Sequence, residues 1–295
     1  MNLLATIPSP GSGAIHIGPL QLRAYGLMIA LGVIAAVWLF GRRMEQKGIG
    51  TRDDASSVSV WAVAAGVLGA RLYHVITSWD TSFSDNPLRI FEIWEGGLGI
   101  PGGLVAGILV GVWRVRARGL PVAASASAAA PAIPLAQAIG RWGNWWNQEI
   151  FGRPTKLPWA LEVDDDVARR AGYPPGTTFH PTFLYESLGN VVICIGLLWM
   201  DRRFKLRPGR LLAVYLAGYA LLRFGVESLR VDEANEILGL RVNTWVSGVV
   251  LVGAVGFLVV DHLRHRGDPD APDAPDESTS GAAEATMADD EADTA

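Results

Sequence analysis

The sequence has little cysteine and little charge, and each shortage excludes a class of protein. Cys194 is the only cysteine, so neither a disulfide framework nor a zinc cluster of thiolates can be built, and we interpret it as a small apolar filler. Charged residues make up 18% of the chain, against about 25% in soluble domains, and half of the residues are hydrophobic. The first 20 residues contain no lysine or arginine, so we predict no signal peptide.

The apolar residues gather in blocks. Blocks of roughly 17–22 residues are long enough, at 1.5 Å per helical residue, to cross a hydrocarbon layer about 30 Å thick. In lipid such blocks must be helical, because the backbone has to satisfy its own hydrogen bonds. Pro131 and Pro134 are expected to kink the fourth block. We predict an all-α integral membrane protein with about seven transmembrane helices, over Tyr25–Phe40, Val58–Ile76, Gly97–Trp113, Leu120–Ile139, Phe183–Met200, Leu211–Val226 and Trp245–Val260.

The number of lysine and arginine residues alternates between high and low in successive loops. The loops after the first, third, fifth and seventh spans hold 14 of them, whereas the alternate loops hold seven. Basic residues are enriched in cytoplasmic loops. We therefore predict that the N-terminus lies outside and that the C-terminus lies in the cytoplasm.

Two segments differ from the spans in composition. The connection from about 142 to 181 holds three consecutive aspartates and several prolines, and we predict a small outer-face subdomain there. Residues 267–295 hold ten acidic residues and no basic one, and we predict a disordered acidic tail. The remaining membrane domain, residues 1–266, carries 25 basic against 19 acidic residues. Such a basic body suits membrane lipid as a partner, and no nucleic-acid partner is expected.

Four arginines fall near or within the predicted spans: Arg23, Arg71, Arg141 and Arg223. An arginine at the centre of a span costs about 2.5 kcal/mol on insertion scales, and it usually faces a partner or a polar cavity. Arg23 fits a snorkelling side chain at the start of the first span, and Arg71 fits either a structural or a functional role. Arg141 and Arg223 are the two that a structural role explains least well.

Arg223 belongs to a polar face of the predicted sixth span. Tyr219, Arg223, Glu227 and Arg230 follow at i, i+4, i+8 and i+11, which places them on one side of a helix. Arg223 and Glu227 are predicted to pair one turn apart, which leaves guanidinium donors directed inward. A packing salt bridge between two spans is the alternative interpretation.

The segment 140–153, GRWGNWWNQEIFGR, carries the strongest signal. If the fourth helix continues through it, Arg141, Asn144 and Asn147 recur every three residues on one side. The tryptophans between them are typical of the membrane interface. Donors beside such anchors are suited to hold a phosphate, and arginine makes bidentate contacts to phosphate oxygens. A purely structural interface belt is the alternative.

Two further segments reach the same predicted outer level. Glycines before and within the start of the third span permit close approach of a ligand, with Gly102 and Gly103 as candidate contacts. Gly103, Gly107 and Gly111 also form a ridge of small residues that favours helix packing. His180 precedes the fifth span and is either a proton acceptor or an ordinary interface residue.

Together these segments resemble the bacterial prolipoprotein diacylglyceryl transferases. GRWGNWWNQEIFG at 140–152 is similar to that family's pattern G-R-x-G-N-x-x-N-x-E-x-x-G. YGLMIALG (25–32), GAR (69–71), HPTFLYE (180–186) and YALLRFGVESLR (219–230) follow in the expected order, so that the resemblance covers nearly all of residues 20–262. The family often has a histidine before two glycines, and this chain has Pro101 there. The functional positions that the resemblance implies are Tyr25, Arg141, Asn144, Glu149, Tyr219, Arg223, Glu227 and Arg230.

The resemblance implies an enzyme of the bacterial plasma (inner) membrane with its active site toward the outer leaflet. Such an enzyme transfers the diacylglyceryl group of phosphatidylglycerol to the thiol of a lipobox cysteine in a prolipoprotein signal peptide and releases glycerol phosphate. Residues 1–266 would then be the catalytic domain. We expect no cofactor and no metal ion, because side chains already supply the positive charge.

Each predicted site residue receives a role under this hypothesis. Arg141 and Arg223 clamp the phosphate. Asn144 and Tyr219 position the headgroup. Glu149 and Glu227 orient the two arginines. The further predicted contacts to phosphatidylglycerol are Asn147, Arg230, Arg71, Gly102 and Gly103, and Tyr25 is predicted to be catalytic.

The acceptor of the thiol proton stays open at this point. Glu149, His180 and His74 are the candidates, in that order. Two other classes of function also stay open. The first is an anion or lipid transporter with an arginine-lined cavity, which would distribute polar residues through several spans. The second is a phospholipid-binding scaffold without chemistry.

Overall fold

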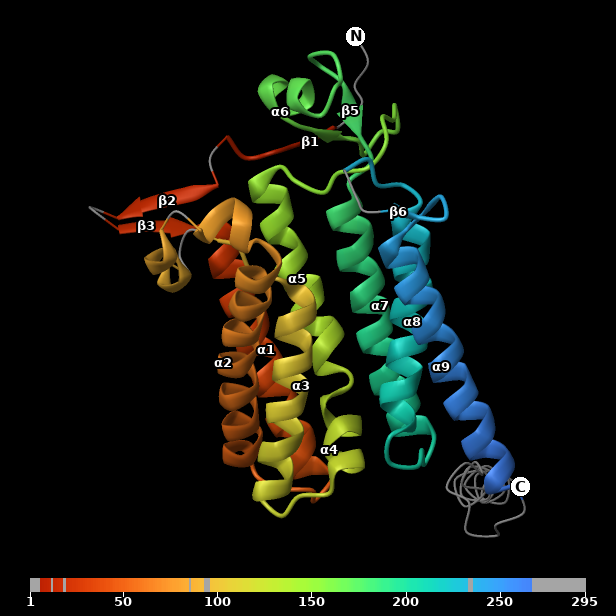
Figure 1. The fold of residues 1–295 in the computed structure, drawn as a ribbon. Helices are drawn as coiled ribbons and strands as arrows, with labels where there is room; N and C mark the ends of the chain where they lie inside the picture. Colours follow the sequence, from red (N-terminus) through yellow and green to blue (C-terminus); the bar gives the residue numbers. More distant parts are fainter. Residues whose placement is uncertain are drawn as a thin grey trace, which may run out of the picture.

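A computed structural model describes residues 6–11, 13–17, 20–84, 86–92, 96–232 and 236–266 as a bundle of long helices with a smaller cap at one end (Figure 1). The predicted acidic tail, residues 267–295, lies outside the described residues. The long helices and their continuations are α1 (Ala24–Gln46), α2 (Arg52–Thr77), α3 (Ile100–Ala117), α4 (Val122–Ala129), α5 (Ala132–Asn147), α7 (Thr182–Arg203), α8 (Arg210–Glu227) and α9 (Val242–Arg264).

Six spans within the described part of the chain are long and apolar enough to cross a membrane, with α4 and α5 taken as one interrupted span. The helix at the predicted sixth span, α8, is less apolar because its 18 residues include Arg210, Arg223 and Glu227. It packs beside α7 and α9 in the bundle (Figure 1). The mostly helical, multi-pass architecture is as predicted, and the count of seven spans stays a prediction.

The predicted kink in the fourth span is confirmed. α4 ends at Ala129 and α5 begins at Ala132, with Pro131 between them. Proline has no backbone N–H to donate, so the ladder of helical hydrogen bonds breaks at this point. α5 then continues to Asn147, well beyond the predicted end at Ile139, and the 140–147 segment is helical as the phosphate hypothesis requires.

Glycines let α2 and α3 pack backbone against backbone. A Cβ atom on Gly102 would lie 2.3 Å from the carbonyl oxygen of Gly69, and one on Gly103 would lie 3.0 Å from that of Gly66. A Cβ atom on Gly107 would lie 3.2 Å from another carbonyl oxygen of α2. The predicted packing ridge is therefore confirmed. Gly102 and Gly103 face a neighbouring helix, and their contact with lipid stays a prediction.

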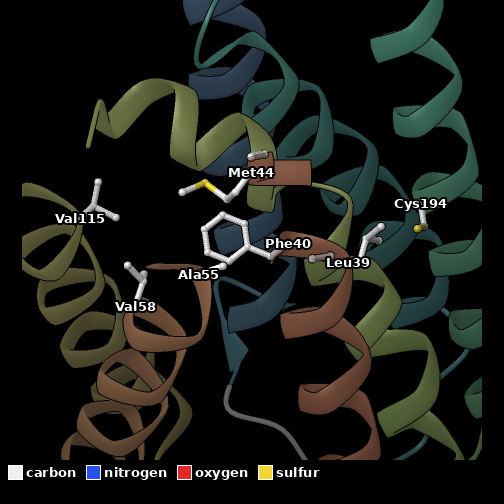
Figure 2. Packing of buried hydrophobic residues seen from close by; sticks show 9 residues of the cluster. Leu39, Phe40, Met44, Ala55, Val58, Val115 and Cys194 are labelled. Carbon is white, nitrogen blue, oxygen red and sulfur yellow. The ribbon is translucent and has the colours of Figure 1, made fainter. Parts of the chain in front are cut away.

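A hydrophobic cluster ties α1 to its neighbours (Figure 2). Phe40 and Met44 of α1 pack with Val58 of α2 and Val115 of α3, and Met44 is completely buried. Leu39, on another side of α1, belongs to the same cluster as Cys194 of α7 (Figure 2). The free thiol is a buried member of a hydrophobic core, as predicted.

One end of the bundle carries a small cap, which we call the head (residues 148–181 together with β1, Ile7–Pro8). It contains β4 (Leu161–Glu162), α6 (Asp165–Arg170) and β5 (Thr178–Phe179), and its three strands form one sheet in the order β1-β4-β5. The head begins after α5, which includes Trp142, where we placed the start of the insertion. Its assignment as an outer-face subdomain stays a prediction. Participation of the N-terminal segment in its sheet was not predicted.

Gln148 joins the head to α5. It adopts a left-handed conformation (φ 52°) that ends the helix. Its side-chain amide donates to Asp164 at 2.8 Å and to the Pro10 carbonyl at 3.2 Å, and its oxygen accepts from the Asp164 N–H at 2.7 Å. One buried side chain thus fixes both the head and the N-terminal segment above the end of α5.

Two hairpins flank the head end of the bundle. β2 (Ala14–Ile17) pairs with β3 (Leu20–Arg23) before α1, and β6 (Glu236–Ile237) pairs with β7 (Leu240–Arg241) before α9. The other end, which we call the basic end, is where α1, α3, α7 and α9 finish (Figure 1). The 14 basic residues lie at the ends of these helices, in the loops after them or at the start of the next helix. The basic residues thus gather at one end of the bundle. The orientation of that end in a membrane stays a prediction.

Candidate active site

Arg141 of α5 and Arg223 of α8 meet at one carboxylate. Arg141 Nη2 lies 2.5 Å from Glu186 Oε2, and Arg223 Nη1 lies 3.0 Å from Glu186 Oε1. Glu186 projects from α7, which packs against both α5 and α8, and it is only 1% exposed. Two guanidinium groups that are 82 residues apart in sequence therefore share one buried carboxylate at the head end of the bundle.

Glu227 forms a second shared carboxylate, one turn after Arg223. Its Oε2 lies 2.8 Å from Arg223 Nη2, which confirms the predicted pair, and 3.5 Å from Arg230 Nη1. Its Oε1 lies 3.1 Å from Arg241 Nε and accepts from the Asn243 amide at 3.3 Å. Glu227 is 3% exposed. It holds Arg223 against the loop that leads into α9.

Asp232 closes this chain of charges. It accepts two hydrogen bonds from Arg230, at 2.7 and 2.6 Å, and lies 3.0 Å from Arg241 Nη2. Its partial burial by itself raises the pKa, but the hydrogen bonds and charge of Arg230, with the charge of Arg241, outweigh burial and lower the pKa of Asp232 below its usual value. Burial alone would lower the pKa of Arg230, and Asp232 and Glu227 raise it.

The cluster has guanidinium donors to spare and a net positive charge. Each guanidinium has five N–H groups. Among the described residues, Arg141 contacts only Glu186 and, at 3.4 Å, Asn144, whereas Arg223 contacts only Glu186 and Glu227. The set of four arginines and three carboxylates carries a net charge of +1: Arg141, Arg223, Arg230 and Arg241 against Glu186, Glu227 and Asp232.

Glu149 lies at the other side of Arg141 and faces amides instead of an arginine. Its Oε1 accepts from Asn144 Nδ2 at 2.8 Å and from Asn147 Nδ2 at 3.3 Å. Asn144 also accepts from Arg141, so it links the guanidinium to Glu149. Within the described chain the carboxylate paired with Arg141 is Glu186. Glu149 reaches Arg141 only through Asn144, and its predicted role in orienting this arginine stays a prediction.

Tyr25 and Tyr219 lie beside this cluster. The Tyr25 ring packs on the glycine two residues after Arg141, where a Cβ atom would lie 2.6 Å from ring Cδ2, and its phenol is within electrostatic reach of Glu149 and Arg141. Tyr219 lies one turn before Arg223 on α8, with its ring stacked on Tyr215 at 5.9 Å between centroids. Both tyrosines are thus placed near the arginines, and their roles stay predictions.

Arg71 has a different environment from the two clustered arginines. Its Nε donates to the Ile90 carbonyl at 2.9 Å, its Nη1 to Gly96 and Gly97 at 2.6 and 3.2 Å, and its Nη2 to Arg89 and Glu92. All five N–H groups thus donate to carbonyl oxygens of the connection between α2 and α3. Its predicted contact with phosphatidylglycerol stays a prediction that would require part of this set to open.

The two histidine candidates have aromatic and hydroxyl neighbours. His180 Nδ1 lies 3.1 Å from the Tyr185 hydroxyl, which also accepts from Trp159 Nε1 at 3.0 Å. Because a hydroxyl oxygen has two lone pairs, Tyr185 accepts from His180 Nδ1–H or donates to Nδ1 according to the imidazole tautomer, and Nε2 makes no hydrogen bond with the described residues. His74 Nδ1 lies 3.3 Å from the Ser78 hydroxyl.

Sequence reasoning missed three members of the cluster: Glu186, Asp232 and Arg241. Glu186 stands in the quoted segment 180–186 and is the single carboxylate of α7 before the basic end. A search for carboxylates in predicted spans, made as it was for arginines, would have found it. Arg241 is one of the seven basic residues of the alternate loops, and nothing in the sequence indicates that this loop, which also holds Asp232, folds back onto Glu227.

Comparison with known proteins finds one family that matches most of the chain. The sequence model of the family described as prolipoprotein diacylglyceryl transferase matches residues 12–260. A phosphatidylglycerol–prolipoprotein diacylglyceryl transferase 2 of Streptomyces coelicolor is 52% identical over 271 residues, which cover 90% of this chain and 83% of that protein. Phosphatidylglycerol–prolipoprotein diacylglyceryl transferases of Streptomyces griseus and Corynebacterium glutamicum are 51% and 47% identical, covering 88% and 85% of this chain and 78% and 83% of those proteins.

Proposed function

This chain belongs to the prolipoprotein diacylglyceryl transferase family, and we propose that it transfers the diacylglyceryl group of phosphatidylglycerol to the cysteine thiol of prolipoproteins. The acceptor is the lipobox cysteine of the signal peptide. The enzyme is a multi-pass protein of the bacterial inner membrane, and its site opens toward the outer leaflet, at the end of the bundle that the charge pattern assigns to the outside.

One observation carries this proposal: Arg141 and Arg223 share Glu186 while keeping N–H groups without a partner in the described chain. The phosphodiester of phosphatidylglycerol carries one negative charge, which matches the net charge of +1 on the cluster. Arginine binds phosphate oxygens through parallel N–H donors. The unused N–H groups are therefore the contacts assigned to the phosphate.

The reaction is a displacement at a glycerol carbon. The cysteine sulfur forms a bond to that CH₂, the bond from the carbon to the phosphate ester oxygen breaks, and glycerol phosphate leaves with the electron pair. Negative charge grows on the phosphate oxygens as that bond breaks. Arg141 and Arg223, only 20% and 13% exposed, stabilise this charge more effectively than they would in water.

The thiol must lose its proton, because the thiolate is the nucleophile and a free thiol has a pKa near 8.5. Glu149 is the acceptor that we assign. It is exposed at the rim of the cluster, and Asn144 connects it to Arg141. Pro101, at the position where the family often has a histidine, cannot accept a proton. The proton then resides on Glu149 while sulfur attacks. Glu149 is not one of the four arginines and three carboxylates of the cluster, so their net charge of +1 is unchanged.

Glu186 is a positioning residue in this mechanism. One carboxylate fixes the two guanidinium groups at one place, and its charge prevents their mutual repulsion before lipid binds. Glu227 does the same for the far side of Arg223. The transporter alternative is not favoured, since the relatives are named as transferases and the shared charges gather at the head end instead of along several spans.

The direct test is a transfer assay with purified full-length protein in vesicles that contain phosphatidylglycerol, mixed with a peptide bearing a lipobox cysteine. The expected product is a peptide heavier by one diacylglyceryl group. Arg141→Ala is expected to lower the rate about 10³-fold, since it removes donors aimed at the developing charge. Arg170→Ala, an exposed arginine of α6, is the matched control and is expected to keep the rate.

Two results would contradict the proposal. One is a native protein that binds phosphatidylglycerol and yields no mass gain, which would indicate a lipid-binding scaffold. The other is near-normal transfer by Arg141→Ala at an unchanged protein level, which would remove Arg141 from the reaction.

A further inference from the structure

A cavity lined by both charged and apolar side chains lies at the basic end, remote from the arginine cluster. Its volume is about 280 Å³, and its wall includes Lys47 at the end of α1, Ser127 of α4, Asp201 of α7 and Arg207 just before α8. This is where the helices α1–α4 meet the helices α7 and α8. The cavity takes no part in the proposed transfer reaction.

Cations outnumber carboxylates among the described residues around this cavity. Asp201 is neutralised twice, by Lys47 Nζ at 2.7 Å and by buried Arg43 Nη1 at 3.1 Å. Asp261 of α9 pairs with Arg210 and is within electrostatic reach of Arg207. The described charged residues in and beside the cavity are four cations and two carboxylates: Arg43, Lys47, Arg207 and Arg210, and Asp201 and Asp261.

The first turn of α8 adds main-chain donors to the same wall. Leu211, which lines the cavity, is 1% exposed, and the described residues offer no acceptor to its N–H or to that of Leu212. The first turn contains no acidic residue and no side-chain cap. The preceding residue, Gly209, has a φ of 95° and donates its N–H to the Ser127 hydroxyl at 2.6 Å. A helix start with such orphan amides favours an anion.

We propose that this cavity binds a phosphate-bearing anion, namely the headgroup of an anionic phospholipid from the leaflet at the basic end. Lysine, arginine and main-chain N–H groups supply the donors that a phosphate needs. Leu206 and Leu211 supply apolar wall for the first atoms of the glycerol backbone. A volume of about 280 Å³ is small for a ligand cavity, so the headgroup enters and the acyl chains stay in the bilayer.

Binding at this place would join the two groups of helices. The anion would contact α1 through Lys47 and the start of α8 through Arg207, in addition to the existing bridge from Asp201 to α1. The expected result is a lipid-dependent gain in stability without a change in the transfer reaction. The inference is independent of the proposed function.

The test uses the full-length protein in phosphatidylcholine nanodiscs with or without phosphatidic acid, and in a separate arm with inorganic phosphate. The unfolding midpoint is measured for the native protein, for Arg207→Gln, and for Arg116→Gln, an exposed arginine of α3 that does not line the cavity. Phosphatidic acid is expected to raise the midpoint by about 4 °C at roughly tenfold its Kd in the native protein and in Arg116→Gln. Arg207→Gln should lose most of that rise.

The arms separate the possible outcomes. A rise with inorganic phosphate that Arg207→Gln also loses would assign the site to a soluble anion instead of a lipid and would overturn the lipid assignment. Equal rises in Arg207→Gln and Arg116→Gln, or no rise in any protein, would overturn the site itself. If Arg207→Gln does not fold, Lys47→Gln replaces it, because Arg43 remains to pair with Asp201. Transfer to a lipobox peptide should be unchanged in Arg207→Gln, so a failure here is distinguishable from failure of the proposed function.

Discussion

Arg43 near the basic end and Arg141 near the head end are both arginines in long helices, but their partners differ in kind. Arg43 uses each of its nitrogens on its own acceptor: Nε on the Ala128 carbonyl at 2.8 Å, Nη2 on the Ser127 carbonyl at 3.3 Å and Nη1 on Asp201 at 3.1 Å. Arg141 shares one carboxylate with Arg223 and contacts no main-chain carbonyl within the described residues.

This difference indicates which arginines hold the fold and which are kept for a ligand. A guanidinium saturated by carbonyls fixes the chain segments that carry them, as Arg71 does for the connection between α2 and α3. A guanidinium that shares carboxylates keeps donors for an incoming anion, and it tolerates the absence of the anion because the carboxylate limits the repulsion between cations. Mutations at the two kinds of arginine should therefore separate stability from activity.

Arg223→Ala and Arg43→Ala test this separation with the largest effects. Arg223→Ala is expected to lower transfer about 10³-fold, because it removes half of the proposed phosphate clamp. Arg43→Ala is expected to lower the free energy of unfolding by about 3 kcal/mol, because it leaves buried carbonyls without donors and Asp201 with one cation. Transfer assays and unfolding in denaturing detergent measure the two effects. A large activity loss in Arg43→Ala at full folding would remove the distinction.

Glu186→Gln sharpens the comparison, because it keeps the shape of the side chain and removes the shared charge. We expect transfer to fall about 10- to 100-fold, which corresponds to about 1.4–2.7 kcal/mol. We also expect phosphatidylglycerol to stabilise Glu186→Gln more than the native protein, since the phosphate then supplies the only negative charge between Arg141 and Arg223. Unfolding midpoints with and without the lipid check this. An equal stabilisation of both proteins would mean that lipid phosphate does not approach these arginines.

Arg71→Lys should act mainly on stability. Lysine has three donors where arginine has five, so at least two of the five carbonyl contacts are lost, at about 1 kcal/mol each. We expect a decrease of about 2 kcal/mol in the free energy of unfolding and less than a tenfold change in transfer. If Arg71 instead binds phosphatidylglycerol, the KM for that lipid rises while the stability stays unchanged, and steady-state kinetics would reveal it.

Asp232→Asn should produce the smallest effect, and one that depends on pH. The pKa of Asp232 is lowered from 3.8 in the folded protein, so its contribution to stability is complete above that value and is lost as the pH falls through the folded pKa. Asp232→Asn should therefore lose stability near neutral pH and show a weaker decline than the native protein under acid. Unfolding midpoints across that range measure the difference. Parallel acid profiles would contradict the role of Asp232 as an ionised partner of Arg230.

The helices, the kink and the α5 site residues could be predicted because each follows from local chemistry. Apolar blocks must be helical in lipid, and Pro131 interrupts the hydrogen bonds of a helix. The three-residue spacing of Arg141, Asn144 and Asn147 places them on one side of a helix. The pairing of Arg223 with Glu227 followed from the i, i+4 rule in the same way. These inferences need only neighbours in sequence.

The carboxylate that joins Arg141 to Arg223 could not be assigned from local pattern, because its position depends on α7 lying between α5 and α8. The same reason explains why the pairing of Glu186 with Arg141 and the contact of Arg241 with Glu227 were missed. The head sheet, with β1 beside β4, joins residues more than 150 positions apart. Contacts of this kind depend on how distant helices and strands are arranged in space, and local sequence pattern does not predict that arrangement.

A double-mutant cycle with Arg141→Lys and Arg223→Lys tests most directly whether the two guanidinium groups act on a single phosphate. Lysine keeps each charge and removes the planar fork, so folding should be little affected. If both arginines hold one phosphodiester together, either single change disrupts the clamp, and the double variant should be about as slow as the slower single one. Rate losses that multiply in the double variant would mean that Arg141 and Arg223 act independently, and the shared site would be contradicted.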